Sequence, residues 1–247
     1  MDDRQAAADV ARSLLEQARQ RVTDGHPEAA RRLWQAAADL AEAQALPGVR
    51  MQAQHELAAF DLRDRDLDAA RARLDEALGL ARAAAEDAPL AAIAGRLGQV
   101  LVFQGEPHHG VVVMREAIAA WDRLGQVQPV RELELAIQAV CARTDKAVAQ
   151  AGDASMPRAQ ALFGRARVRL ACEDAAGARA DLNAAWPLVQ RGGDAESVGV
   201  VGTLLGQLLA AAGAPEAVTV LTTARAAWSS CGAAHQVRAI DAMLAGG

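Results

Sequence analysis

The stretch Leu97-Gly-Gln-Val-Leu101, followed shortly by Gly105-Glu-Pro107, recurs later in the chain as Leu205-Gly-Gln-Leu-Leu209 followed by Gly213-Ala-Pro215. The turn-like part of this pattern also recurs at a constant spacing, at positions 25, 65 and 105 and again at positions 173 and 213. Self-similarity at a period of roughly 20–50 residues is the signature of repeat architectures. The sequence therefore predicts a chain of stacked repeats.

Composition and proline placement predict that each repeat is helical. Alanine is the commonest residue, tyrosine is absent, and aromatic residues make up 3% of the chain, which favours helices over strands. Seven of the eight prolines lie where the apolar pattern starts a helix, at positions 27, 47, 89, 107, 129, 157 and 215. Pro187 lies inside a helical pattern, so we expect a kink or an early helix end there. One period accommodates two helices of roughly 16 residues and two turns, so each repeat should be a helical hairpin.

The second helix of each repeat shows a recurring pattern of a small residue, a large apolar residue four positions later and alanine three positions after that. The pattern is found at Ala30, Trp34 and Ala37; Ala70, Leu74 and Ala77; Gly110, Met114 and Ala117; Ala178, Leu182 and Ala185; and Ala217, Leu221 and Ala224. These residues resemble the tetratricopeptide repeat (TPR) family, in its 40-residue bacterial variety. The resemblance implies an all-α, right-handed α-solenoid of stacked antiparallel helical hairpins with about 11 to 13 helices.

The spacing of the repeats predicts how this solenoid is organised. The interval between the turns at positions 105 and 173 is much longer than the interval within either set of turns, so the regular period is interrupted there. We therefore expect one solenoid over residues 1–247, built from sub-arrays 1–128 and 157–247. An irregular helical segment, 129–156, should join them, and a capping helix at 235–244 should end the second. The four tryptophans are predicted to pack mainly within and between hairpins.

Charge and cysteine usage exclude several classes of protein. The net charge of −5 has the wrong sign for a nucleic-acid-binding protein. The uncharged stretch 197–215 aligns with residues 89–107, which contain Arg96, so we expect a core helix rather than a membrane span. The three cysteines form no paired motif, and the acidic N-terminal residues do not resemble a secretory leader. These observations favour a cytoplasmic protein, and the near-exclusive use of arginine over lysine, typical of a GC-rich genome, favours a bacterial origin.

Motifs for catalysis and metal binding are absent from the sequence. His55-Glu56 begins a zinc motif, but position 59 is alanine, and no P-loop, nucleophile elbow or dinucleotide fingerprint occurs. The adjacent pair His108 and His109, and the aspartates at 61, 64, 66 and 68, are interpreted as solvated turn and capping residues. We expect no enzyme activity, cofactor or metal. An all-α enzyme would need converging titratable groups near residues 140–160.

The first helix of each repeat should line a concave groove with the stripe opposite its packing face. The predicted groove residues are Arg12, Glu16, Arg19, Gln52, His55, Arg63, Arg96, Gln99, Phe103, Gln160, Phe163, Arg167 and Gln207. Arginine and glutamine donors suit the carbonyls and carboxylates of a peptide, and the two phenylalanines could anchor apolar side chains. A solvated helix face would carry the same residue types, so this alternative stays open.

The resemblance and the groove together predict a non-catalytic scaffold or adaptor that binds a protein or peptide partner. The alternative is a peptide or small-ligand sensor module of a bacterial transcriptional regulator. Binding of chaperone tails through a Lys/Asn/Arg clamp is disfavoured, because the only lysine, Lys146, lies outside the stripe and the only asparagine, Asn183, lies on a second helix. Terminal repeats expose an apolar face, so a homodimer is possible if the capping helix does not cover it.

Overall fold

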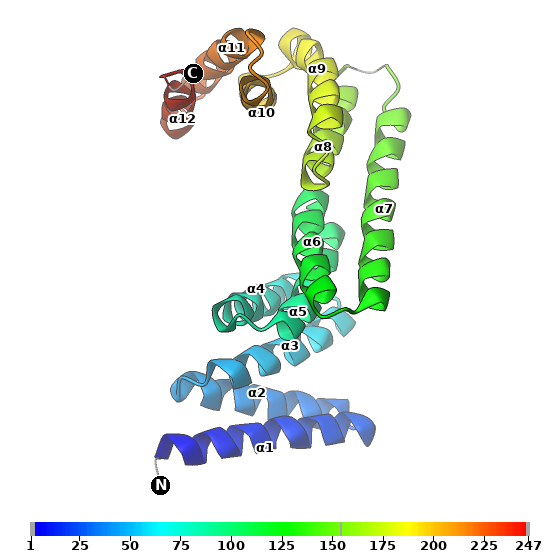
Figure 1. The fold of residues 1–247 in the computed structure, drawn as a ribbon, viewed down its shortest axis with the longest axis vertical. Helices are drawn as coiled ribbons and strands as arrows, with labels where there is room; N and C mark the ends of the chain where they lie inside the picture. Colours follow the sequence, from blue (N-terminus) through cyan, green and yellow to red (C-terminus); the bar gives the residue numbers. More distant parts are fainter. Residues whose placement is uncertain (1–2, 154, 246–247) are drawn as a thin grey trace. The chain divides into compact units, whose positions relative to one another are not determined.

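The computed structural model describes residues 3–153 and 155–245, which form twelve α-helices joined by short turns (Figure 1). The helices are α1 (Asp3–Thr23), α2 (Pro27–Ala43), α3 (Pro47–Arg63), α4 (Leu67–Ala84), α5 (Asp87–Phe103), α6 (Pro107–Arg123), α7 (Val127–Gln150), α8 (Ser155–Ala171), α9 (Ala175–Gly192), α10 (Ala195–Ala211), α11 (Glu216–Ser230) and α12 (Ala234–Ala245). The predicted all-α solenoid of consecutive hairpins is confirmed.

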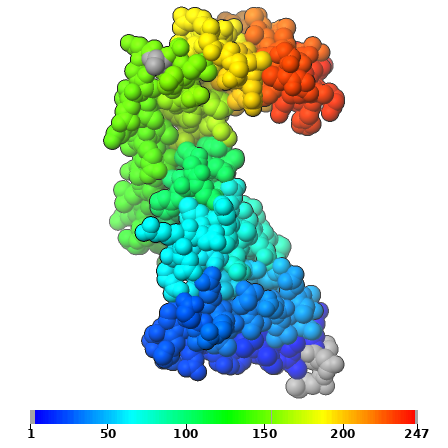
Figure 2. Space-filling view, turned by 180° about the vertical axis from the view of Figure 1, so that it is seen from behind, coloured from blue at the N-terminus to red at the C-terminus, as the bar shows by residue number. Residues whose placement is uncertain are grey.

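The chain forms two compact units, Met1–Ile137 and Gln138–Gly247, which divide inside α7. In the first unit the hairpins α1–α2, α3–α4 and α5–α6 pack in chain order, with α2 against α3 and α4 against α5. Figure 2 shows the blue to cyan helices of this unit as one continuous mass of side chains. In the second unit, α8–α9 packs on α10–α11, and α12 packs on α11.

The recurring turn pattern reflects a backbone requirement. Positions 25, 65, 105, 173 and 213 all have positive φ, between 63° and 84°. Glycine adopts this left-handed conformation without strain and ends helices for that reason. Arg65 and Glu173 adopt it as well, at the cost that a Cβ imposes there. The turn conformation therefore recurs even where the glycine does not.

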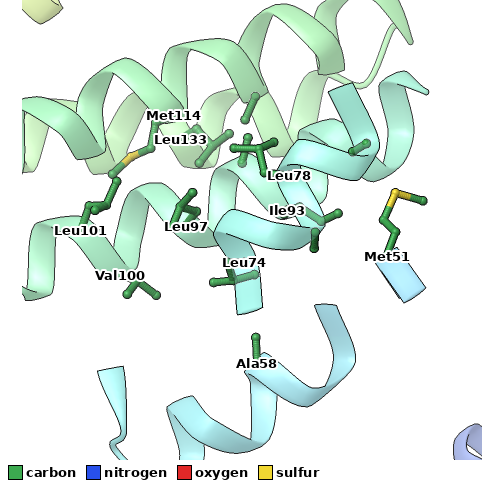
Figure 3. Close-up of a cluster of buried hydrophobic side chains, with 14 residues drawn as sticks. Met51, Ala58, Leu74, Leu78, Ile93, Leu97, Val100, Leu101, Met114 and Leu133 are labelled. Carbon is green, nitrogen blue, oxygen red and sulfur yellow. The ribbon is translucent and has the colours of Figure 1, made fainter. Parts of the chain in front are cut away.

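The pattern in the second helices reflects close packing. Its final alanines, at positions 37, 77, 117, 185 and 224, are all 0% exposed, and its large residues are at most 3% exposed. A Cβ on Gly98 would lie 2.8 Å from the carbonyl oxygen of Gly110, so the backbones of α5 and α6 touch there. Figure 3 shows Leu97, Leu101 and Met114 in the resulting core, together with Leu133 from α7.

The long repeat seen in the sequence is also a repeat in the structure. The shift along the chain that carries Leu97 onto Leu205 also carries the first and last residues of α3, α4 and α5 onto those of α8, α9 and α10. Residues related by this shift therefore occupy equivalent places in the two units. This equivalence is used below to compare individual contacts.

Each hairpin has one position on its first helix and one on its second helix that are equivalent from hairpin to hairpin; we call this pair of positions the hairpin slot. The slot holds apolar residues in two hairpins and oppositely charged residues in two others. The slot is occupied by Leu101 and Val113 in α5–α6 and by Leu209 and Val220 in α10–α11. In α3–α4 it holds Asp61 and Arg73, with Arg73 Nε donating to Asp61 Oδ2 at 2.7 Å. In α8–α9 the charges are exchanged, and Arg169 Nη1 lies 2.9 Å from Asp181 Oδ2.

The hairpin slot corrects the interpretation of the acidic cluster. Asp61 is only 3% exposed and also accepts a hydrogen bond from Arg31 Nη2 at 2.9 Å, so it is a buried structural ion rather than a solvated turn residue. Asp66 does cap α4, accepting from the Ala69 N–H at 3.0 Å. His109 lies in the first turn of α6, and its Nδ1 is 2.9 Å from Glu106 Oε2.

Helix α9 continues through Pro187 to Gly192, so the predicted early end of this helix is wrong. Proline has no N–H to donate to the carbonyl of the residue four positions earlier, here Asn183. Pro187 and Asn183 are both exposed, so water is accessible to this part of the helix. Trp186 packs beside Gly202 of α10, and Val189 is 2% exposed. These contacts hold the last turn of α9 in place.

Within residues 3–153 and 155–245, no helix combines the length and apolar character that crossing a bilayer requires. In the same residues, no cluster of three or more histidine, cysteine, aspartate or glutamate side chains is suited to hold a metal ion.

Candidate binding surface

The predicted groove residues all lie on first helices of the hairpins. Helix α1 carries Arg12, Glu16 and Arg19, α3 carries Gln52, His55 and Arg63, α5 carries Arg96, Gln99 and Phe103, α8 carries Gln160, Phe163 and Arg167, and α10 carries Gln207. We call the set on α1, α3 and α5 the first-unit stripe and the set on α8 and α10 the second-unit stripe. Each stripe is described within its own unit.

The first-unit stripe brings residues of successive first helices together. Arg19 Nη2 on α1 donates to Gln52 Oε1 on α3 at 3.3 Å. Arg96 Nη1 on α5 donates to the backbone carbonyl of His55 on α3 at 3.3 Å. Stripe residues on three successive first helices are therefore in contact.

Other residues of this stripe have contacts elsewhere. Arg12 pairs with Asp9 of its own helix at 3.0 Å. Arg63 Nη2 donates to Glu28 Oε1 of α2 at 2.7 Å, and its guanidinium lies 4.9 Å from the centre of the Phe60 ring. Arg63 is thus directed toward the preceding second helix. Phe103 is 71% exposed.

The pKa of His55 in the first-unit stripe is strongly shifted. Burial of the imidazole, with a smaller contribution from the Arg96 guanidinium, lowers the pKa of His55 from 6.5 to about 4. Its Nε2 is buried and has no hydrogen-bond partner among the described residues. His55 is therefore neutral at pH 7 and cannot supply a positive charge to a ligand.

The second-unit stripe borders a pocket of about 220 Å³ between α8 and α10. Its floor is formed by Ala159, Val189 and Val201, which are at most 4% exposed. The half-buried walls include Met156, Phe163 and Val200, and Ser197 also lines the pocket. The exposed rim holds Gln160, Asp194 and Glu196. We call this cavity the α8–α10 pocket.

The sequence analysis found part of this pocket and missed the rest. Gln160 and Phe163 were predicted, whereas Met156, Asp194 and Glu196 were not. The missed residues lie at the N-terminal ends of α8 and α10, one or two turns from the stripe. Consecutive first helices run in the same direction, so their N-terminal ends lie at the same end of the unit. The sequence could therefore have indicated that residues at the N-terminal ends of α8 and α10 lie close together.

The remaining second-unit stripe residues lie close to apolar or aromatic groups. The guanidinium of Arg167 lies 5.6 Å from the centre of the Phe163 ring, within cation–π range. Gln207 Nε2 lies 3.8 Å from the sulfur of Met243 on α12. The capping helix therefore contacts this end of the stripe.

Strongly bound carboxylates elsewhere have structural roles. Asp181 accepts from Arg165 through both oxygens, at 2.9 Å and 2.6 Å. Glu106 accepts from Arg71 at 2.6 Å, and this bond, with a smaller contribution from His109, lowers the pKa of Glu106 to about 2. A carboxylate held this firmly by arginine stays ionised and is a poor proton donor or acceptor at neutral pH.

The repeated hairpins, their turns and their close-packed small residues define the chain as a TPR-like helical-repeat protein. No protein-family model matches the chain, and no curated protein matches it either.

Several solved structures resemble the chain over most of its length. TPR-like repeats from Podosopora anserina, described as kinesin light chain, are 17% identical, with 90% of this chain and 95% of that chain covered and a TM-score of 0.40. The TPR2AB domain of yeast Sti1, solved in complex with pHSP90, is 12% identical, with 96% and 98% covered and a TM-score of 0.42. BtubC from P. vanneervenii is 16% identical, with 93% and 91% covered and a TM-score of 0.40. All three TM-scores are below 0.5, and the fold is defined by the helices, turns and packing of this chain itself.

Proposed function

We propose that the chain is a non-catalytic scaffold or adaptor that binds a protein or peptide partner along the stripes of its first helices. The observation that supports this most directly is the α8–α10 pocket. It contains two of the predicted stripe residues, Gln160 and Phe163, and has a fully buried apolar floor. An apolar pocket with a polar rim is the usual arrangement for anchoring one side chain of an interaction partner.

The size of the pocket favours a peptide over a small ligand. Small-molecule and cofactor sites typically enclose about 300–1,000 Å³, whereas this pocket encloses about 220 Å³. That volume suits one large side chain, with the rest of the ligand outside. The proposal thus ranks above the alternative of a small-ligand sensor module. We also propose a bacterial and cytoplasmic setting, supported by the use of arginine in place of lysine and by three cysteines that form no paired motif in the sequence.

A displayed library of random peptides tests this function. Peptides enriched on the immobilised full chain are labelled, and their affinities are measured by fluorescence anisotropy. Val200→Trp fills the α8–α10 pocket from its half-buried wall and should weaken binding at least tenfold without lowering the melting temperature. Val218→Trp is the matched control, because Val218 is 61% exposed on α11 and should leave affinity unchanged. Failure to enrich any peptide, or equal affinity for the Val200→Trp variant, would overturn the proposal.

A further inference from the structure

We propose that the α8–α10 pocket selects an apolar side chain that is accompanied by a positive charge, as in a peptide where leucine or methionine adjoins lysine or arginine. This inference rests on the proposed function and specifies the ligand of the same site. It is supported by the separation of apolar and acidic residues within the pocket. The apolar residues form the floor and walls, and the acidic residues stand at the mouth.

The mouth of the pocket is acidic. Asp194 and Glu196 are both exposed there, and none of the described residues that line the pocket is basic. The nearest arginine along α8, Arg158, donates to the carbonyl of Gly152 at 2.6 Å and pairs with Asp153 at 3.6 Å. Its charge is therefore directed to the turn before α8.

The Asp194 carboxylate stays ionised at neutral pH. Asp194 is the N-cap of α10 and accepts a hydrogen bond from the Ser197 N–H at 2.7 Å. This bond lowers the pKa of the Asp194 carboxyl. Glu196 has no ion-pair partner among the described residues and lies in the first turn of the same helix. A cationic group at the mouth would meet both charges.

Helix ends contribute smaller charges around the pocket. The C-terminal end of α9, beside Val189, carries a partial negative charge, and the N-terminal ends of α8 and α10 carry partial positive charges. Each helix end is equivalent to about half a charge, so the two full carboxylate charges dominate. Exposed ion pairs are weak, so we expect a three- to tenfold preference for a cation, not an absolute requirement.

Three probes with the same side chain and different charges test the inference on the full chain. Leucinamide is a cation, N-acetyl-leucinamide is neutral, and N-acetyl-leucine is an anion. Each is titrated against protein with labelled methyl groups, and binding is followed from the methyl signals of Met156, Val200 and Val201, which line the pocket. We expect leucinamide to bind about three- to tenfold more tightly than the neutral probe, and the anion to bind most weakly.

The variants separate charge from structure. Asp194→Ser keeps a good N-cap while removing the charge, and Glu196→Gln keeps the helix-forming side chain. Together they should bring the three affinities to within about twofold of one another. Glu216→Gln is the matched control, because Glu216 also lies in the first turn of a helix in this unit, yet outside the pocket. It should preserve the preference.

The outcomes distinguish this inference from the proposed function. Equal affinities for the three probes, with shifts at the pocket methyls, would overturn the charge preference and leave peptide binding intact. A preference that survives the double variant would also overturn it. If no probe shifts these methyls, the pocket is not an apolar anchor, and both the inference and the pocket-based function fail.

A separate observation concerns two cysteines in the second unit. The sulfurs of Cys141 on α7 and Cys172, which directly follows α8, lie 3.8 Å apart, and both residues are half-buried. They are far apart along the chain, so their spacing in the sequence gave no indication of a pair. Cys231 is exposed on the turn after α11.

From this geometry we infer that Cys141 and Cys172 form a reversible disulfide. The bond requires a sulfur separation of about 2.05 Å, so the two sulfurs must move closer together than they lie in this structure. The two thiols lose two protons and two electrons as the Sγ–Sγ bond forms. A small-molecule disulfide such as glutathione disulfide accepts both and is released as two thiols. In reducing compartments such bonds are usually transient and redox-sensing.

Mass spectrometry of the full chain treated with glutathione disulfide tests this pair. We expect a peptide cross-link between Cys141 and Cys172, whereas Cys231 should carry glutathione. In the variant Cys141→Ser, Cys172 should carry glutathione in place of the cross-link. Dithiothreitol should reverse both products. Glutathione attached to both Cys141 and Cys172 in the parent chain, without a cross-link, would overturn the inference.

Discussion

Replacing Asp61 in the hairpin slot of α3–α4 should destabilise the first unit strongly. Its carboxylate is 3% exposed and receives hydrogen bonds from Arg73 and Arg31. Asp61→Leu would leave both guanidinium groups facing an apolar side chain. Removing one partner of a buried ion pair typically costs about 3–5 kcal/mol.

The partners of Asp61 set the magnitude within that range. The side chain of Arg31 is 35% exposed and retains Asp64 at 2.6 Å, and that of Arg73 is 26% exposed and retains Gln54 at 2.7 Å. Because each arginine keeps another partner and some water, we expect a loss of about 3 kcal/mol, at the low end. At a slope of about 2 kcal/mol per molar, this lowers the urea midpoint by about 1.5 M.

A second substitution should restore most of this loss. Asp61→Leu with Arg73→Leu recreates the apolar slot found in the hairpins α5–α6 and α10–α11. Replacing a buried ion pair by apolar residues of similar volume is often neutral. We therefore expect the double variant to lie within about 1 kcal/mol of the parent protein. Asp64→Leu is the control, because Asp64 binds the same Arg31 from an exposed position and should cost less than about 1 kcal/mol.

Urea unfolding followed by amide hydrogen exchange gives the readout. Peptides from α3 and α4 report the first unit by itself, which matters because the two units need not unfold together. The reasoning is refuted if the double variant is as unstable as Asp61→Leu, since the orphaned charges would then not be the cause. It is also refuted if Asp61→Leu costs no more than Asp64→Leu.

Three further perturbations have expected outcomes. The pKa of His55 is about 4 in the folded protein and 6.5 in the unfolded chain. Between these two pH values the unfolded chain binds a proton that the folded protein does not bind, so acid favours unfolding. Lowering the pH from 6.5 to 5 should therefore cost about 1.6 kcal/mol in the free energy of unfolding, and His55→Leu should flatten this dependence; an equal slope in both proteins would contradict the assignment. Gly98→Ala places its Cβ 2.8 Å from a backbone oxygen of α6 and should cost about 1–3 kcal/mol. The control Gly79→Ala meets nothing within 4 Å and should gain about 0.5–1 kcal/mol, both measured by urea unfolding. Trp34→Ala, at a site 3% exposed, should cost about 3–5 kcal/mol by the same measurement, and a loss below about 1 kcal/mol would place this ring outside the core.

The fold could be predicted because its determinants are local and recurrent. A left-handed turn residue, a proline in a first helical turn and a small residue at a helix contact each impose a short sequence pattern, and the pattern returns at a regular spacing. Pro187 shows the limit of local rules. Proline disfavours a helix interior, but the packing of Trp186 and Val189 holds α9 in place beyond it. Tertiary contacts decided that helix end.

The candidate site could be predicted only where it follows the repeat. The repeat offsets selected Arg19, Gln52 and Gln160, and Phe163 was predicted beside the stripe; in the structure Arg19 contacts Gln52, and Gln160 and Phe163 line the pocket. The acidic mouth lies on a helix end outside the repeating stripe, and the paired cysteines follow no period. Contacts of this kind depend on three-dimensional placement, which no spacing in the sequence records.

The acidic residue of the hairpin slot lies on the first helix in α3–α4 and on the second helix in α8–α9. This exchange disfavours pairing between helices of different repeats. Helices α3 and α8 are equivalent, as are α4 and α9, so a hybrid hairpin of α3 with α9 would have matching lengths and small-residue positions. That hybrid would place Asp61 against Asp181, and the reciprocal hybrid would place Arg169 against Arg73. Like charges in a buried slot are strongly unfavourable, whereas each native hairpin pairs opposite charges at 2.7 Å or 2.9 Å. The exchange therefore makes each native pairing more favourable than its hybrid, which an apolar slot such as Leu101 with Val113 cannot do.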